Sequence, residues 1–326
     1  MFKIYCLKII FYFVKDYKKY VYWYLNVKNN IVFSIFLIFS FFTTYSANLF
    51  DDYYLKKTVE AFLFIGSLAE NKYNFYENGL YRKCNIKSDS DSLYLYFHGN
   101  AEFINNYNFI PIFNCVPDNK NISTLFYEYP GYFNTFWKYK DATIENFIDY
   151  SKEIAKEIIS FKKKKIYIVG WSLGVWVSLL VINSLRKYIY ENDIKVKVVL
   201  LNGFYDLYDV MDEIGGVLKN DNIISILFNI VVRKLSKLFI SGSINDKLSN
   251  FKLIKNIEDI SEIKYVTLDS ISHFGFFSNN RDNETIFNFF LNNKSNKKIE
   301  ILMTSARADK ITGRGMFKIF KEIRNK

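Results

Sequence analysis

The sequence predicts a three-layer α/β domain, in which helices cover both faces of a mostly parallel β-sheet. Short runs rich in Ile, Val, Leu and Tyr alternate with longer segments whose apolar residues recur at helical spacing, an order typical of βαβ units. The strand-like runs lack strict alternation of apolar and polar residues, as expected when both faces of a sheet are buried. A chain of 326 residues that is 50% hydrophobic and contains only 3 Pro can build one large domain with its own core.

The expected strands are short and alternate with the expected helices. The strands cover residues 92–99, 123–132, 165–170, 195–203, 237–242 and 263–270, the second of them ending in a turn. The helical segments cover residues 102–114, 142–160, 173–187 and 283–292. Asp141 is the expected N-cap of the second of these helices, because a carboxylate can accept a hydrogen bond from the first helical turn.

An uncharged segment precedes this domain. Residues 29–50 contain no charged side chain and, as a helix, are long enough to cross a hydrocarbon layer of about 30 Å. Six lysines lie before this segment, so the positive-inside rule puts the N-terminus in the cytoplasm and the domain on the opposite side of a membrane. We therefore expect a single-pass transmembrane anchor. The alternative is a cleaved signal peptide and a secreted protein, although so long a basic leader is unusual for one.

The formal charge of +11 is concentrated at the two ends of the chain. Residues 1–30 carry +5 and residues 294–326 carry +7, whereas residues 31–293 carry −1. A nearly neutral middle argues against nucleic acid as a partner and favours anionic lipid near the basic flanks. We expect residues 1–28 to form a basic cytoplasmic segment, residues 70–293 to form the α/β domain, and the last 33 residues to form a basic tail.

The segment KIYIVGWSLG places a serine where a strand gives way to a helix. Ser172 lies between Gly170 and Gly174 in the pattern G-x-S-x-G. A turn this tight leaves almost no room for a side chain two positions to either side of the serine, so glycine is needed at both. The turn holds the serine hydroxyl above the sheet edge, at the positive end of the following helix. Ser172 is therefore the candidate nucleophile of a serine hydrolase.

A serine hydroxyl needs a base within hydrogen-bond reach to become a good nucleophile. The chain has two histidines, His98 and His273. His273 follows the last expected strand and precedes the last expected helix, where the order serine, acid, histidine puts the base. His98 ends the first expected strand, in FHGN, and a structural role suits it better. His273 is the candidate base.

A third residue should orient the imidazole from a loop between the nucleophile and the base. Asp246, after the expected strand KLFISG, is the acid we predict. Asp206 and Asp209, which follow the preceding strand, remain alternatives. Asp269 lies on or just after the last expected strand, where solvation is more favourable. Any of these carboxylates can also serve simply as a turn residue, as most loop aspartates do.

Acyl transfer also needs hydrogen-bond donors for the oxyanion that develops on the substrate. The backbone N–H of Leu173, directly after the candidate nucleophile, is one expected donor. The second is expected from the loop after His98 and Gly99, from the N–H of Asn100 or Ala101. Gly99 allows this loop to bend close to the substrate.

Four motifs in the correct order resemble the α/β-hydrolase superfamily. They are FHGNAEFINNY (97–107), YEYPGY (127–132), GWSLG (170–174) and ISHF (271–274). More narrowly, they resemble its membrane-anchored serine hydrolases with an HGNA loop, a branch that includes depalmitoylating thioesterases and esterase-like proteins. This resemblance covers roughly residues 70–293 and implies a mostly parallel sheet of about eight strands. It also implies a catalytic triad of Ser172, Asp246 and His273.

The sequence departs from this family pattern in three places. The acid usually stands three residues beyond the glycine that ends its strand, whereas here Ser-Ile-Asn separates Gly242 from Asp246. Phe133 stands where a glycine commonly follows Y-P-G-Y. The basic segment 294–326 has no counterpart in the family pattern.

The sequence therefore predicts a membrane-anchored serine hydrolase that cleaves an ester or thioester of a small molecule, an acyl lipid or a lipidated protein. A peptidase or acyltransferase with the same triad, or a catalytically silent scaffold with the same fold, is the alternative. We expect no cofactor, because the sequence contains no metal-ligand cluster, phosphate-binding loop or dinucleotide fingerprint. The odd number of cysteines, 3, does not indicate a disulfide framework.

Overall fold

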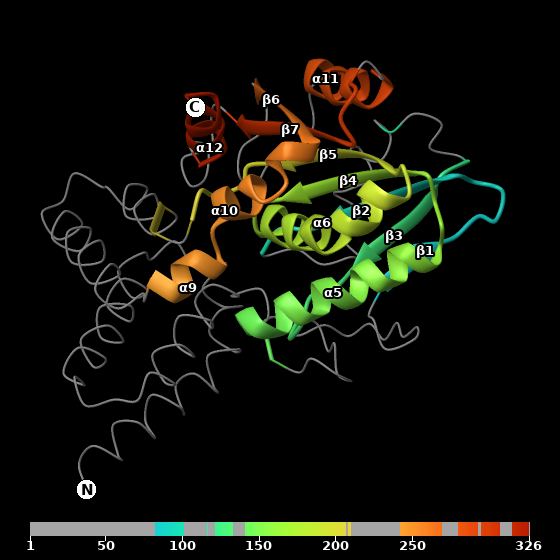
Figure 1. The fold of residues 1–326 in the computed structure, drawn as a ribbon, viewed down its shortest axis with the longest axis horizontal. Coiled ribbons are helices and arrows are strands. Elements are labelled where there is room, and N and C mark those ends of the chain that lie inside the picture. Colours follow the sequence, from blue (N-terminus) through green and yellow to red (C-terminus); the bar gives the residue numbers. More distant parts are fainter. Residues whose placement is uncertain are drawn as a thin grey trace, which may run out of the picture.

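A β-sheet with helices packed on it forms the described part of the chain (Figure 1). The computed structural model describes residues 82–100, 116, 121–132, 141–206, 208–209, 242–268, 280–292, 295–306 and 315–325. The strands are β1 (Arg82–Asn85), β2 (Ser92–Phe97), β3 (Ser123–Tyr127), β4 (Lys165–Trp171), β5 (Lys195–Leu201), β6 (Ser261–Leu268) and β7 (Ile299–Ala306). The helices are α5 (Ile144–Ser160), α6 (Leu173–Glu191), α9 (Gly242–Lys247), α10 (Asn250–Lys255), α11 (Asn280–Leu291) and α12 (Gly315–Arg324), with a 3₁₀ turn at Glu258–Ile260.

The sheet is mostly parallel, as the sequence predicts. Its strands lie in the order β1-β3-β2-β4-β5-β7-β6. The edge strand β1 pairs with β3 in antiparallel orientation, and the other six strands are parallel to one another. Five of the six expected strands are present. The sixth, 237–242, lies outside the described residues except for Gly242, which begins α9.

Both faces of the sheet are covered, which explains why its strands lack an apolar–polar alternation. Along β5, Val198 and Leu200 belong to the core that includes α5, α6, α10 and α12. The residues between and after them, Val199 and Leu201, belong to the core that includes α11. Neighbouring side chains of a strand point to opposite faces, so a strand buried on both sides needs apolar residues at successive positions. Figure 1 shows α5 and α6 running together along one face.

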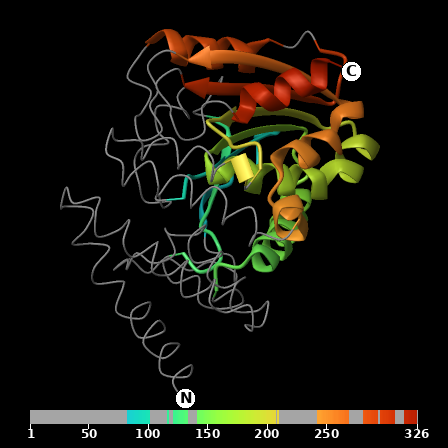
Figure 2. The ribbon, with the colours of Figure 1, turned by 90° about the vertical axis from the view of Figure 1, so that its left-hand side faces the viewer.

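The last 33 residues do not form the separate basic tail that the sequence suggested. Strand β7 lies inside the sheet, paired with β5 on one side and β6 on the other. Helix α12 contributes Met316 and Ile319 to the larger core. Figure 2 shows β6 and β7, in orange and red, continuing the sheet beyond the green central strands. The net positive charge of this segment suggested a solvated tail. The apolar run IEILM within it instead forms part of β7, which is hydrogen-bonded to a strand on each side.

Helix α5 begins two residues later than the sequence suggested. Thr143 is its N-cap, with an extended backbone (φ −118°, ψ 153°) and a side chain that accepts a hydrogen bond from the N–H of Asn146. Asp141 contributes only its main-chain carbonyl, which accepts from the Asn146 side chain at 2.8 Å. The threonine hydroxyl therefore takes the capping role that we assigned to the carboxylate.

The expected transmembrane segment 29–50 lies outside the described residues. Within the part of the chain that the structure does describe, no helix combines the length and the apolar character needed to span a bilayer.

Candidate active site

Ser172 occupies a strained turn between β4 and α6. Its backbone has φ 52° and ψ −111°, a conformation that residues other than glycine rarely adopt. The turn is held by the N–H of Ser172, which donates to the carbonyl of Leu201 at 2.9 Å. The residue is largely buried, with 8% of its surface exposed. Strain of this kind persists where the surrounding structure enforces it, and it is frequent at functional sites.

The two glycines of the motif are required by close contacts between main chains. A β-carbon on Gly170 would lie 2.6 Å from the carbonyl oxygen of Gly174. A β-carbon on Gly174 would collide with the Phe97 carbonyl and lie 2.7 Å from the His98 carbonyl. These distances are shorter than a β-carbon normally makes, so any residue other than glycine would force the neighbouring main chain to move, which agrees with the sequence prediction.

The same contact places the serine turn beside the loop that follows β2. Strands β2 and β4 are neighbours, and Phe97 pairs with Gly170 in their register. Ser172 and Asn100 therefore follow adjacent parallel strands at the same edge of the sheet. Leu173, one of the expected oxyanion donors, is the first residue of α6. Ala101 lies outside the described residues.

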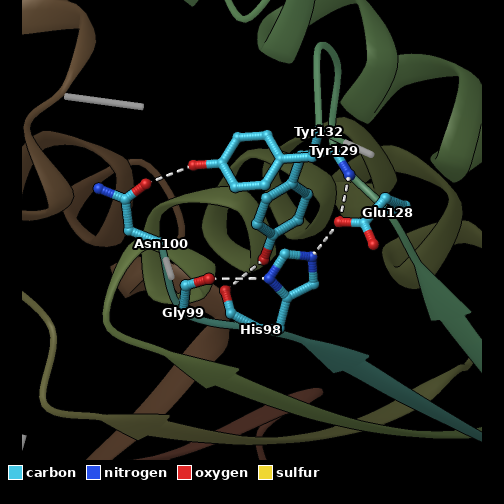
Figure 3. A network of polar contacts seen from close by, with 6 residues as sticks. All are labelled: His98, Gly99, Asn100, Glu128, Tyr129 and Tyr132. Atoms are coloured by element: carbon cyan, nitrogen blue, oxygen red, sulfur yellow. Dashed lines mark hydrogen bonds and ion pairs between the residues drawn. The ribbon is translucent and has the colours of Figure 1, made fainter. Parts of the chain in front are cut away.

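His98 connects this loop to the segment after β3 (Figure 3). Its Nδ1 donates to the Gly99 carbonyl at 2.8 Å, and its Nε2 lies 2.7 Å from Oε1 of Glu128. Both side chains are almost completely buried, each with 1% of its surface exposed. The structural role that the sequence favours for His98 agrees with these contacts.

Two tyrosines of the YEYPGY segment complete the network. The hydroxyl of Tyr129 donates to the His98 carbonyl at 2.6 Å, and its ring stacks on the imidazole with 4.0 Å between ring centroids. The hydroxyl of Tyr132 donates to Oδ1 of Asn100. Burial, together with the nearby Glu128 carboxylate, raises the pKa of Tyr132 well above its ordinary value. This phenol therefore stays protonated and remains a hydrogen-bond donor.

Sequence reasoning did not identify Glu128, Tyr129 or Tyr132 as site residues. The signal for Glu128 was present, because a carboxylate directly after the apolar strand STLFY is expected to need a buried partner. Only the pairing of β3 with β2 shows that this partner is His98.

The candidate acids hold definite positions, and each has a polar partner. Asp246 lies within α9 rather than in a loop, and its half-exposed carboxylate forms an ion pair with Lys252 at 2.6 Å. Asp206 accepts hydrogen bonds from the Asn245 side chain and from the N–H of Asp209. The identity of the catalytic acid, Asp246 or one of its two alternatives, stays a prediction.

Asp209 is a partly buried carboxylate, with 17% of its side-chain surface exposed. Burial raises its pKa, and an ion pair with Lys318 at 3.3 Å partly opposes that effect. The ammonium of Lys318 also lies over the ring of Tyr205, which directly follows Gly203 and Phe204 at the end of β5. Asp209 therefore takes part in docking α12 against this segment.

The candidate base, His273, and the rejected acid Asp269 lie outside the described residues. In the described segments, no group of three or more His, Cys, Asp or Glu residues is arranged to hold a metal ion.

Neither a family model nor a curated protein matches the sequence. Several solved structures resemble parts of this chain. Est1E from Butyrivibrio proteoclasticus, solved with ferulic acid bound, is 11% identical to this chain at a TM-score of 0.40. The match covers 76% of this chain and 93% of the Est1E chain. The esterase Pf2001 from Pyrococcus furiosus shares 12% identity, with 78% and 95% covered, at a TM-score of 0.40. A lipase-esterase related protein from Clostridium acetobutylicum shares 16% identity, with 76% and 99% covered, at a TM-score of 0.35.

At these identities and TM-scores, the similarities assign neither a family nor an activity to this chain. The function proposed below therefore depends on the geometry of the chain's own residues.

Proposed function

We propose that the protein is a serine hydrolase that cleaves an ester or thioester bond through an acyl-enzyme. The observation that carries this proposal is the strained turn at Ser172, where a buried serine is held between a strand and a helix beside the loop His98–Asn100. The φ of 52° and ψ of −111° at Ser172 together lie in a region that residues other than glycine rarely occupy, and strain of this kind is frequent at functional sites. The resemblance of four sequence motifs to serine hydrolases supports the same reaction.

The proposed reaction has two half-reactions. Oγ of Ser172 attacks the acyl carbon while His273 takes the hydroxyl proton, and a bond from Oγ to that carbon forms. The tetrahedral intermediate collapses, the carbon–oxygen or carbon–sulfur bond of the substrate breaks, and the alcohol or thiol leaves with the proton from His273. Water, deprotonated by His273, then attacks the acyl-enzyme and releases the carboxylic acid and the free serine.

The oxyanion formed in each half-reaction requires donors that are already in place. We assign this role to the N–H of Leu173 and to the N–H of Asn100 or Ala101. The close approach of Gly174 to the main chain of Phe97 and His98 supports this pairing, because it brings the start of α6 against the end of β2.

The assignment of His273 as base depends on its reach from β6. Three strand spacings of about 4.8 Å separate β4 from β6, so the base has to bridge roughly 14 Å across the sheet edge. His273 lies five residues beyond Leu268, the last residue of β6. A chain of five residues extends up to about 17 Å, which is sufficient. Asp246 is the proposed acid, with Asp206 and Asp209 as alternatives.

We also propose a membrane-bound location and an acylated substrate. The uncharged residues 29–50, preceded by six lysines, support a single-pass anchor with the catalytic domain on the side opposite the cytoplasm. A hydrolase at a membrane surface is well placed for acyl lipids and lipidated proteins. Extraction of the full-length chain with alkaline carbonate tests the anchor, because release into the supernatant would contradict a spanning helix.

Labelling with a fluorophosphonate probe tests the hydrolase proposal. The folded wild-type chain should be labelled, and Ser172→Ala should abolish the labelling. His273→Ala should slow it severely, because the serine loses its base. Ser178→Ala is a matched control, since Ser178 is a buried serine of α6 whose hydroxyl donates to the Gly174 and Val175 carbonyls. Absence of wild-type labelling, or labelling that survives Ser172→Ala, would contradict the proposal.

A further inference from the structure

The buried pair His98 and Glu128 is not explained by a general structural role alone. A buried carboxylate and a buried imidazole are costly unless each is hydrogen-bonded. Their position is specific, because His98 directly precedes the two residues of the expected oxyanion loop, Gly99 and Asn100. The hydrogen bonds of the pair indicate what it does for this loop.

The hydrogen on Nδ1 of His98 is fixed by its partner. The Gly99 carbonyl only accepts hydrogen bonds, so Nδ1 at 2.8 Å from it carries a hydrogen. Nε2 lies 2.7 Å from a carboxylate oxygen of Glu128, and one hydrogen lies between these two atoms. Glu128 therefore holds the ring in the orientation that lets Nδ1 donate to Gly99. The ring of Tyr129, stacked on the imidazole, prevents it from tilting.

The direction of the Gly99 carbonyl sets the direction of the next N–H. In a planar trans peptide, the carbonyl of one residue and the N–H of the next point to opposite sides, and no described peptide bond is cis. A Gly99 carbonyl held against His98 therefore directs the Asn100 N–H away from the imidazole. The side chain of Asn100 is also held in place, because the hydroxyl of Tyr132 donates a hydrogen bond to its Oδ1.

We propose that Glu128, acting through His98, is a positioning residue that orients the Gly99–Asn100 peptide so that the Asn100 N–H donates to the oxyanion. This inference rests on the proposed serine hydrolase function and selects Asn100 from the two candidates for the second donor. Glu128 itself does not touch the substrate. Its effect is transmitted by two hydrogen bonds, from the carboxylate to the ring and from the ring to the carbonyl.

Two substitutions of Glu128 distinguish positioning from packing. Glu128→Leu keeps the size of the side chain but leaves Nε2 of His98 without its partner. Glu128→Gln keeps a partner, because the amide N–H donates to Nε2 of a neutral imidazole that still carries its hydrogen on Nδ1. A positioning role therefore predicts loss of activity with leucine and rescue with glutamine.

The experiment measures hydrolysis of p-nitrophenyl butyrate by the full-length chain and its inhibition by a trifluoromethyl ketone, which forms a tetrahedral adduct with the serine. Glu128→Leu should lower kcat about 10- to 100-fold with little change in KM, because the oxyanion exists only in the transition state. The inhibition constant should rise by the same factor as kcat/KM falls. Glu128→Gln should remain within about threefold of wild type.

Glu157→Leu is the matched control. Glu157, on α5, accepts a hydrogen bond from the hydroxyl of Tyr127 at 2.8 Å, so it is a carboxylate bonded to the residue just before Glu128. Its substitution should leave kcat unchanged. If Glu128→Leu does not fold, Glu128→Met replaces it, since its flexible apolar side chain also removes the hydrogen-bond partner of Nε2 but packs more adaptably. It should lower kcat rather than raise KM.

The outcomes separate the inference from the function on which it rests. If wild type is inactive and is not labelled by fluorophosphonate, the proposed function is wrong and the inference is wrong with it. If wild type is active but folded Glu128→Leu or Glu128→Met keeps wild-type kcat, only the inference is overturned. Equal losses for leucine and glutamine at position 128, or an effect confined to KM, would also overturn it.

Discussion

Gly174, in the first turn of α6, lies directly against the main chain of Phe97, the last residue of β2. A β-carbon at this glycine would collide with the Phe97 carbonyl oxygen and lie 2.7 Å from that of His98. This contact joins two motifs that are more than seventy residues apart in the chain. It brings the turn that carries the candidate nucleophile to the loop that carries the candidate oxyanion donor.

Gly174→Ala is expected to separate these two motifs. The added methyl group meets backbone atoms that cannot rotate away, so α6 or the loop has to move, at a cost of about 1–3 kcal/mol in the free energy of unfolding. Fluorophosphonate labelling should fall by a factor of about 100, because catalytic geometry tolerates little displacement. Ser184→Ala, elsewhere on α6, is the control and should change neither quantity much. Unchanged labelling of Gly174→Ala would show that the contact is dispensable.

Ser172→Gly is expected to stabilise the protein while abolishing its labelling. Glycine adopts positive φ without the steric cost that serine incurs, so the free energy of unfolding should rise by about 1 kcal/mol. Ser172→Ala keeps the strain, loses the nucleophile and should show no such gain. Urea unfolding of the three proteins measures the difference. Equal stability of the glycine and alanine variants would mean that the turn stores no strain.

Asp246→Asn tests the acid. Loss of the charge that orients and stabilises the imidazole should lower kcat by a factor of about 100 or more. Stability should change by less than about 1 kcal/mol, because the ion pair with Lys252 is half exposed. Asp206→Asn and Asp209→Asn are measured beside it. The variant with the largest loss of kcat at unchanged KM identifies the acid, and a full kcat for Asp246→Asn would transfer the role to a rival.

Asp209 should make stability depend on pH in the acid range. Burial raises its pKa above the ordinary 3.8, so the folded protein holds this proton more tightly than the unfolded chain does. Its contribution is therefore fully present below about pH 3.8 and is lost as the pH rises through the higher folded pKa. Asp209→Asn should remove that fall, which begins above about pH 3.8. Asp149→Asn, at an exposed ion pair with Lys152, should leave it in place.

Lys197 on β5 and Glu300 on β7 form a buried ion pair that attaches the late strand to the sheet. They are register partners, with 3.6 Å between Nζ and Oε1. The ammonium also donates to main-chain carbonyls of Phe289 and Asn292 at the end of α11. Lys197→Met leaves a buried charge unpaired and should cost about 3–5 kcal/mol.

The double variant Lys197→Met, Glu300→Met should recover most of that loss, to within about 2 kcal/mol of wild type, because no charge then remains buried. Chemical denaturation of the two single variants and the double variant measures the coupling. Additive losses would mean that the two side chains act independently.

The strand and helix periodicities identified most of the central sheet before any coordinates. Runs such as KIYIVG and KVKVVLLNG have one physical explanation, burial on both faces, and the structure places them as β4 and β5. The G-x-S-x-G pattern likewise predicted the serine turn, because the two glycines indicate a turn too tight for larger residues. The strand at residues 299–306 was not predicted, because the many basic residues around it indicated a solvated tail and its apolar run is short.

What the sequence determined by itself is local: where strands and helices form, which serine stands in a tight turn, and which residues are chemically able to serve it. The tertiary structure alone decided which segments become neighbours, and so revealed that Glu128 holds His98 and that β7 lies between β5 and β6. Such pairings depend on the free energy of packing distant segments together, and no short stretch of residues encodes them.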